Sequence, residues 1–527
     1  MGDVELVLIS LFIAVAVLNA AADRLSVPYP IVLVLGGLVL AGLPGVPEVE
    51  LDPDLVLVIF LPPLLYAAAF FSDLRSLRAN VRPLSLTAIG LVLLTTVVVA
   101  VLAHEVIGMP WAVAFALGAI VSPTDPVAAT AIMRRVGAPR GIVNLVEGES
   151  LFNDAAALVA YRVAVAAAIG GTFSLLDASL EFVGAVVGGV AIGLAVAWVI
   201  GEIRRRLDDP QTEITISLFT GYAAFIPAEE LHLSGVLAAV SAGIYLGWRA
   251  PELISPQTRL QTIGTWEVLV FLLNAILFVL IGLQLPVVLD GLAGRPTLEP
   301  VAYAAIVAAA VILVRFLWLF TVPYLIRVID RRPQQRERRV GWRPRVVVGW
   351  SGMRGAVSLA AALAIPLETD AGAAFPERDL ILFITFAVIL VTVVGQGLTL
   401  PALIRRLGVT EDGTEEEREE LRARLAAAKA AIQRLDELEL EDWTRNETVE
   451  RMRGLYEFRK RRFATRAGKA EDDGIEDRSL NYQRMVHMVL QAQREALIRL
   501  VRDGEISAEV MRRIERELDL EESRLEV

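Results

Sequence analysis

The stretch that decides the fold is Ser122-Pro123-Thr124-Asp125-Pro126, which lies inside the apolar run 111–134. Each proline removes a backbone donor and clashes with the preceding helical turn, so the pair predicts an interrupted helix. An aspartate here is also unfavourable, since a charge at the centre of a bilayer costs about 2.5–3.5 kcal/mol. Asp125 therefore marks a broken membrane helix and a candidate functional position.

Apolar runs of membrane length surround this break. The 527 residues are 55% hydrophobic with a mean hydropathy of +0.56, which is too apolar for a typical soluble protein. Stretches of about 20 apolar residues predict an all-α polytopic membrane protein with about thirteen transmembrane helices. They lie near 4–22, 28–44, 54–71, 82–107, 111–134, 143–169, 175–202, 212–229, 232–248, 262–289, 299–329, 345–367 and 379–405.

Arginine clusters fall in every second loop between these runs, and the intervening loops are acidic or short. This alternation follows the positive-inside rule and places the N-terminus outside and the C-terminus in the cytoplasm. The clusters include Arg134/Arg135/Arg140, Arg204/Arg205/Arg206 and Arg331–Arg345. The sequence thus predicts a multi-pass protein of the lipid bilayer.

The last part of the chain has a different composition. Residues 408–527 are rich in Glu and Arg with apolar positions at helical spacing, as in solvated helices, and Gly474 and Gly504 mark predicted breaks. We expect a transmembrane domain over 1–407 and a cytoplasmic helical tail over 408–527. A regulatory or dimer-contact role for the tail stays open.

Composition excludes several function classes. The chain has no cysteine and three scattered histidines, so thiol catalysis, a thiolate site and a histidine metal centre are not expected. The net charge of −11 is not a nucleic-acid footprint. We expect no cofactor, no nucleic-acid partner and no enzyme activity.

Four charged residues on four predicted helices share one depth near the bilayer midplane. Asp154 lies roughly 16 Å from the cytoplasmic start of its helix at 1.5 Å rise per residue. The other three, Asp125, Arg315 and Arg354, lie about nine to fourteen residues from the cytoplasmic ends of theirs. Each charge at this depth costs free energy of insertion, so four of them at one depth indicate an ion pathway.

A second interruption is predicted around Arg354, where Gly349, Gly352 and Gly355 break the run 345–367. The two interrupted helices run in opposite directions in corresponding halves of the chain, which indicates inverted repeats and a midplane binding site. Asp125 and Arg354 can compensate the positive and negative ends of the unwound helices. Direct participation in ion binding is the alternative for both.

The helix 143–169 carries two adjacent polar stripes. Glu149 and Asn153 are four residues apart, as are Ser150 and Asp154, so each pair shares one helix face. The oxygens of Asp154 and Ser150 are hard ligands that suit sodium or lithium. A satisfied contact between helices is the alternative for Ser150 and Asn153. For Glu149 and Arg315 we expect a buried ion pair that holds the bundle together.

These residues resemble those of the bacterial cation/proton antiporters of the CPA1 type, the NhaP-like group related to animal sodium/proton exchangers. The resemblance covers most of 1–407, and its matching stretches are Phe60–Leu65, Ser122–Ala128, Glu147–Ala155, the context of Arg315 and Gly352–Leu359. It implies a homodimer with a mobile core that contains two crossed broken helices, in the bacterial inner (plasma) membrane. Thr124 and Asp125 would match the first break, Arg354 the second, and Glu149 and Arg315 the charge pair.

The resemblance also implies that Asp154 carries either a proton or the transported cation, with Ser150 and Thr124 as further oxygen ligands of a transported Na+. Some sodium-transporting relatives have an acidic residue where this chain has Ala67, so K+ or Li+ stay open beside Na+. Because residue 153 is Asn and not a second carboxylate, we expect electroneutral exchange that serves cation and pH homeostasis. A cation channel and a membrane sensor with a signalling tail are the alternatives.

Overall fold

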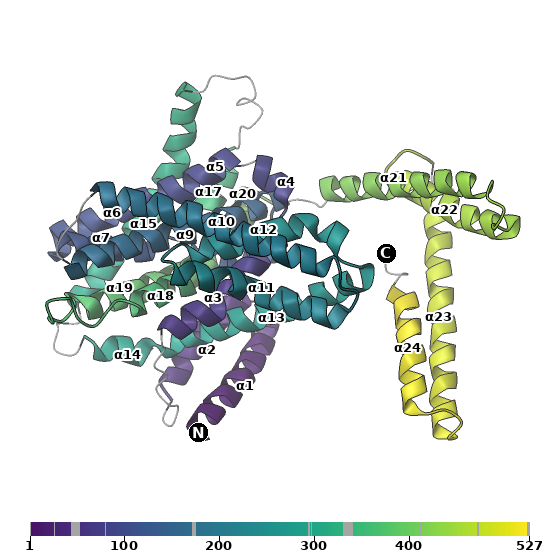
Figure 1. Cartoon of the computed structure of the whole chain (residues 1–527), viewed down its shortest axis with the longest axis horizontal. Helices are drawn as coiled ribbons and strands as arrows, with labels where there is room; N and C mark the ends of the chain where they lie inside the picture. Colours follow the sequence, from purple (N-terminus) through teal and green to yellow (C-terminus); the bar gives the residue numbers. More distant parts are fainter. Residues whose placement is uncertain are drawn as a thin grey trace. The chain divides into compact units, whose positions relative to one another are not determined.

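The computed structural model describes residues 2–25, 27–43, 53–79, 81–170, 175–292, 296, 298–329, 341–410, 414–471 and 474–523. The chain forms two compact units, Met1–Glu411 and Asp412–Val527. The described residues are helical and contain no strand, apart from an isolated bridge between Glu368 and Ala374 (Figure 1). The prediction of an all-α fold is confirmed.

The first unit is a helical bundle (Figure 1). Three π-helical turns, η1 (Leu86–Leu91), η2 (Ala103–Ile107) and η3 (Val391–Gln396), continue neighbouring α-helices. The α-helices are α1 (Gly2–Leu25), α2 (Tyr29–Ala41), α3 (Pro53–Phe70), α4 (Leu74–Ala79), α5 (Val81–Ser85), α6 (Val92–Leu102), α7 (Trp111–Val121), α8 (Pro126–Val136), α9 (Arg140–Gly170), α10 (Leu175–Arg204), α11 (Pro210–Glu230), α12 (Gly235–Leu253), α13 (Pro256–Leu283), α14 (Leu285–Asp290), α15 (Leu298–Ile329), α17 (Trp342–Trp350), α18 (Ala356–Leu363), α19 (Arg378–Leu390) and α20 (Gly397–Leu407).

The apolar runs of the sequence fall on these helices. Among the described residues, seven helices or joined helices are long and apolar enough to cross a membrane, and Tyr29–Ala41 and Leu57–Phe70 are shorter apolar helices. The number of thirteen spans stays a prediction. Most of the predicted arginine-rich loop Arg331–Arg345 and of the predicted acidic loop Glu48–Asp54 lies outside the described residues.

Both predicted interruptions are present. The first separates α7, which ends at Val121, from α8, which begins at Pro126. The second separates α17, which ends at Trp350, from α18, which begins at Ala356. In both places the chain leaves the helix at the prolines or glycines that predict the break.

The interior of this unit is built from close helix packing. The largest apolar cluster joins residues of α7, α9, α13, α18 and α19. Gly118 of α7 faces the backbone of Thr96 in α6, and a Cβ atom there would overlap it. On other surfaces large apolar side chains are exposed, such as Trp198 on α10 and Phe219 on α11. Exposed apolar side chains on membrane-length helices are the surface that lipid covers.

Within its described residues the second unit contains four helices, α21 (Thr414–Leu438), α22 (Asn446–Arg466), α23 (Ile475–Arg502) and α24 (Ala508–Ser523). Two small apolar clusters hold it together, one between α21 and α22 and one between α23 and α24. Gly474 and Gly504 adopt positive φ at helix ends, as their residue type predicts. The outer faces carry ion pairs such as Arg494 with Asp519.

Candidate ion-binding site

The two helix breaks touch each other. The backbone N–H of Asp125 in the first break donates to the carbonyl of Met353 in the second at 2.8 Å. Arg354 of the second break donates through Nε to the carbonyl of Val121 at 3.1 Å, and Val121 is the last residue of α7. Segments more than 220 residues apart in sequence are thus joined by hydrogen bonds at one point.

Asp125 lies at the start of two helices. Its Oδ1 accepts from the backbone N–H of Val127 at 2.8 Å and so caps α8. Its carboxylate also lies against Gly355, which precedes α18, and a Cβ atom at Gly355 would overlap it. Helix N-termini attract negative charge. The position of Asp125 therefore fits compensation of two positive helix ends, and Gly355 is the residue that permits the close approach.

Arg354 lies at the opposite kind of helix end. Its guanidinium is buried and donates to the carbonyls of Val121 and Gly352. The last carbonyls of a helix have no partner within the helix and attract positive charge. This geometry fits the predicted compensation by Arg354.

Four polar residues of α9 are buried: Glu149, Ser150, Asn153 and Asp154. Ser150 donates through Oγ to the carbonyl of Thr124 at 2.9 Å. Asn153 donates through Nδ2 to the Thr124 hydroxyl at 2.8 Å, and its own Oδ1 has no partner among the described residues. Helix α9 therefore fixes the position of Thr124.

Asp154 is the exception within this group. Its side chain is 6% exposed, yet it forms no hydrogen bond or ion pair with any residue that the structure describes. It lines a cavity of about 650 Å³ together with Thr124, Asp125 and Ser150. Burying a charged carboxylate without a partner costs free energy. A proton or a cation that enters the cavity would remove this cost by neutralising Asp154.

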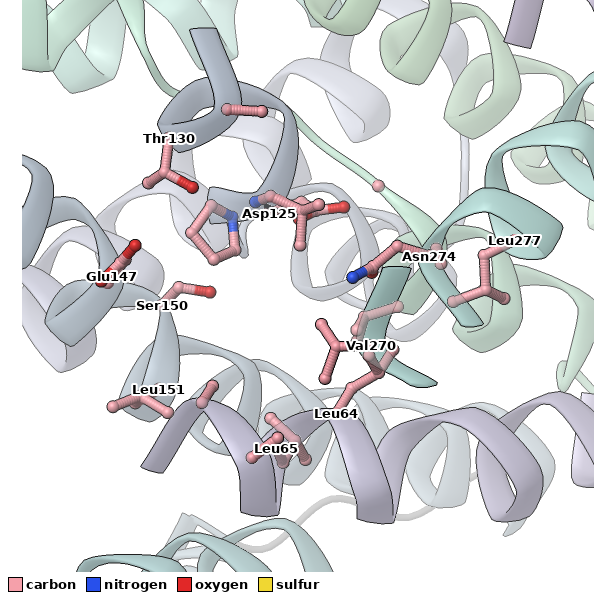
Figure 2. A pocket seen from close by; sticks show the side chains of 18 of the residues that line it. Leu64, Leu65, Asp125, Thr130, Glu147, Ser150, Leu151, Val270, Asn274 and Leu277 are labelled. Atoms are coloured by element: carbon pink, nitrogen blue, oxygen red, sulfur yellow. Dashed lines mark hydrogen bonds between the residues drawn. The ribbon is translucent and has the colours of Figure 1, made fainter. Parts of the chain in front are cut away.

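The cavity is apolar over most of its wall and reaches the protein surface. Leu64 and Leu65 of α3, Leu151 of α9 and Val270 of α13 line it (Figure 2). Arg134 and Glu147 lie at its edge and pair at 2.6 Å with 68% and 36% of their side chains exposed. The exposed pair marks an open mouth, and the buried oxygens lie further inside.

The first unit also matches a known family along almost its whole length. The family model described as "Sodium/hydrogen exchanger, transmembrane" matches residues 8–406. The chain belongs to this sodium/hydrogen exchanger family. Its membership confirms the resemblance that the helix breaks and the Asn153-Asp154 pair suggest, and it confirms a transporter rather than an enzyme.

Two relatives and one solved structure show how far the similarity extends. An uncharacterised Na+/H+ exchanger of Mycobacterium tuberculosis is 36% identical over 523 residues, which cover 98% of this exchanger and 96% of the relative. The sodium, potassium, lithium and rubidium/H+ antiporter of Bacillus subtilis is 35% identical over 416 residues, 76% of this chain and 61% of that protein. The sodium proton antiporter MjNhaP1 of Methanocaldococcus jannaschii has the same fold, with a TM-score of 0.59 at 19% identity over 78% of this chain and all of that one.

Glu149 and Arg315 of this exchanger form an ion pair inside the bundle. Arg315 donates through Nη1 and Nη2 to the two carboxylate oxygens of Glu149 at 2.5 and 3.1 Å. Its Nε donates to the carbonyl of Val348 in α17 at 3.1 Å. Each side chain is 2% exposed. The pair links α9, α15 and α17.

A second ion pair lies eight residues beyond Asp154 on α9. Arg162 pairs with Glu229 at the end of α11 and donates to the carbonyl of Leu233 at 3.2 Å. Glu229 in turn accepts from the backbone N–H of Gly235 at 2.9 Å. The end of α9 away from the open mouth is therefore tied to the α11–α12 turn.

The structure also contains buried polar groups that sequence reasoning missed. Arg204, which the sequence pattern groups with the loop arginines, is the last residue of α10. It is buried and lies 3.8 Å from the equally buried Glu213, so its placement in a loop is wrong. Ser358 of α18 and Asn274 of α13 are buried and line the cavity. Asn274 carried a signal in the sequence, because it is the only polar side chain between Val268 and Leu283.

Proposed function

We propose that this chain is a secondary antiporter in which a proton and a monovalent cation compete for the carboxylate of Asp154. The observation that carries the proposal is the buried Asp154 carboxylate, which has no partner among the described residues and borders the cavity. Either occupant neutralises the site, whereas the empty charged site faces the cost of a bare charge in the membrane. Competition at one carboxylate is sufficient to couple the two fluxes.

Asp125 has a different role in this proposal. Its carboxylate already accepts a hydrogen bond from Val127 and lies at the start of α18, so its charge is offset by two helix ends. The carboxylate of Asp125 stays charged through the transport cycle and holds the two helix breaks against each other. Of the two carboxylates, Asp125 and Asp154, only Asp154 binds and releases the proton and the cation in this proposal.

Hydroxyl and carbonyl oxygens near Asp154 supply further ligands to the cation. Ser150 and Thr124 both border the cavity, and each hydroxyl oxygen keeps lone pairs beside its present hydrogen bond. Oxygen ligands of this kind hold a small alkali cation after it loses water. Asn153 positions Thr124 and does not carry charge.

The two ends of α9 suggest how access alternates. The cavity opens beside Arg134 and Glu147, while the Arg162–Glu229 pair ties the other end. With the N-terminus outside and the C-terminus in the cytoplasm, the open mouth faces the cytoplasm.

We place the exchanger in the bacterial plasma membrane as a homodimer, with residues 1–407 as the exchange domain and 408–527 as a cytoplasmic tail.

The substrate is Na+, with Li+ and K+ as the cations to compare with it. Ala67 lines the cavity and adds no charge to its wall, and the printed name of the Bacillus subtilis relative covers sodium, potassium, lithium and rubidium. In proteoliposomes with a preformed pH gradient, a pH-sensitive dye should report dissipation when one of these cations is added. A gradient that no cation dissipates across pH 6–9 would rule out the proposal.

We expect this exchange to be electroneutral. Residue 153 is Asn and not a second carboxylate, and Asp125 stays charged in this proposal, so one proton leaves Asp154 for each cation that binds. Clamping the membrane potential with valinomycin and K+ on both sides should leave the rate of Na+-dependent proton movement within about twofold. A rate that follows the imposed voltage, at about 2.3 kcal/mol per charge per 100 mV, would show net charge movement.

A further inference from the structure

Asn274 faces the inner part of the cavity from a different helix than Asp154 does. It lies in α13, its side chain is 5% exposed, and it lines the same cavity as Asp125 and Ser150. Figure 2 shows the Asn274 side chain pointing into the pocket, with Ser150 pointing in from α9. Two walls of the cavity thus present polar groups to the same space.

The carboxamide of Asn274 is the second polar feature of the cavity wall. It forms no hydrogen bond with any residue that the structure describes. Its neighbours along the cavity wall, Val270 and Leu277, are apolar and offer no hydrogen-bonding group on their side chains. Because this carboxamide faces a cavity that reaches the surface, its partner is water or another occupant of the cavity.

The chemistry of a carboxamide defines that occupant. Its oxygen is a hard, neutral ligand of the kind that binds alkali and alkaline-earth cations. The amide does not titrate, so it can add a ligand without changing the number of protons exchanged. The terminal torsion of an asparagine side chain varies over a broad range of angles, so rotation about it turns the oxygen toward the cavity. Ser358 of α18 offers a second oxygen without a partner among the described residues.

We propose that Asn274 is a specificity-determining ligand that binds the transported cation from the wall opposite α9. This inference rests on the proposed function and assigns a further ligand to the same site. The cation bound at Asp154 then meets an oxygen of α13, and a cation of the wrong radius cannot satisfy both walls at once. Asn274 sets affinity and selectivity, whereas Asp154 sets the coupling to protons.

The test compares three substitutions in proteoliposomes. Asn274→Leu keeps the branch at Cγ but has no oxygen, and it should raise the KM for Na+ about tenfold, which equals about 1.4 kcal/mol, while Vmax stays within about twofold. Asn274→Asp keeps an oxygen at the same position and should not raise the KM. Val268→Ala, on the exposed face of the same helix and away from the cavity, is the control and should leave the KM within about twofold.

Each result decides the inference. A wild-type KM in Asn274→Leu overturns it, and so does an equally raised KM in Asn274→Asp, since that would show an effect of packing rather than of oxygen. If Asn274→Leu does not fold, Asn274→Ala replaces it with the same expected KM. Failure of the proposed function looks different, because wild type itself would then show no cation-dependent proton movement at any Na+ concentration.

Discussion

Asp154→Asn should abolish cation-dependent proton movement, by at least about a hundredfold. Asparagine has nearly the same shape but cannot exchange a proton for a cation. A cation that enters the variant lacks a compensating charge, and an uncompensated charge in the membrane costs about 3 kcal/mol, which is roughly a hundredfold. The measurement is Na+-induced dissipation of a pH gradient in proteoliposomes. Wild type and variant are reconstituted in equal amounts after size-exclusion chromatography shows that both are folded.

The fold of this variant should be intact. Asp154 forms no hydrogen bond or ion pair with a described residue, so its replacement removes no protein contact of that kind. Glu147→Gln is the matched control, since Glu147 is a carboxylate of the same helix and borders the same cavity but is paired with Arg134 at the surface. We expect it to keep at least half of the activity. Exchange above about a tenth of wild type in Asp154→Asn would contradict the assignment.

Breaking the Glu149–Arg315 pair should strongly destabilise the protein. Removal of one member leaves a charge buried without its partner, at a cost of about 3–5 kcal/mol. For a domain of this size that corresponds to a fall in denaturation temperature of roughly 5 °C. Glu149→Leu and Arg315→Met should each show this fall when the detergent-solubilised protein is heated and the folded fraction is followed by size-exclusion chromatography.

The double variant Glu149→Leu/Arg315→Met should recover most of the loss, because buried ion pairs are often replaceable by apolar pairs of similar volume. The surface pair Arg134–Glu147 is the comparison, and its loss should cost less than about 1 kcal/mol. A double variant that is stable yet inactive would show that the buried pair acts in transport. Single variants as stable as wild type would refute the account of the pair.

The sequence is sufficient to predict the helices and the two breaks, since both depend on local chemistry. Pro123 lies between α7 and α8, Pro126 begins α8, and Gly352 and Gly355 lie between α17 and α18, whereas Gly349 is still within α17. The apolar runs follow from length and composition. The burial of Ser150, Asn153 and Asp154 follows from their spacing on one helix.

The buried Glu149–Arg315 pair is a contact between distant segments that the sequence predicts, but most other such contacts are beyond this reasoning. The approach of Gly355 to Asp125 depends on how two breaks meet, and glycine content alone does not locate it. Arg204 sits at the end of an apolar run beside two other arginines, which looks the same whether it faces solvent or Glu213. The sequence shows Asn274 as a lone polar residue in an apolar run. That it lines the cavity, and that it has no hydrogen-bond partner among the described residues, is known only from the structure.

The most direct test of the central claim, competition between proton and cation at Asp154, is the pH dependence of the KM for Na+ in proteoliposomes. If both ions occupy one carboxylate, the KM should rise about tenfold for each unit by which the pH falls on the acidic limb, while Vmax at saturating Na+ stays constant. A KM that is independent of pH, with Vmax falling instead, would mean that protons act at a separate group, and the single-carboxylate account would be wrong.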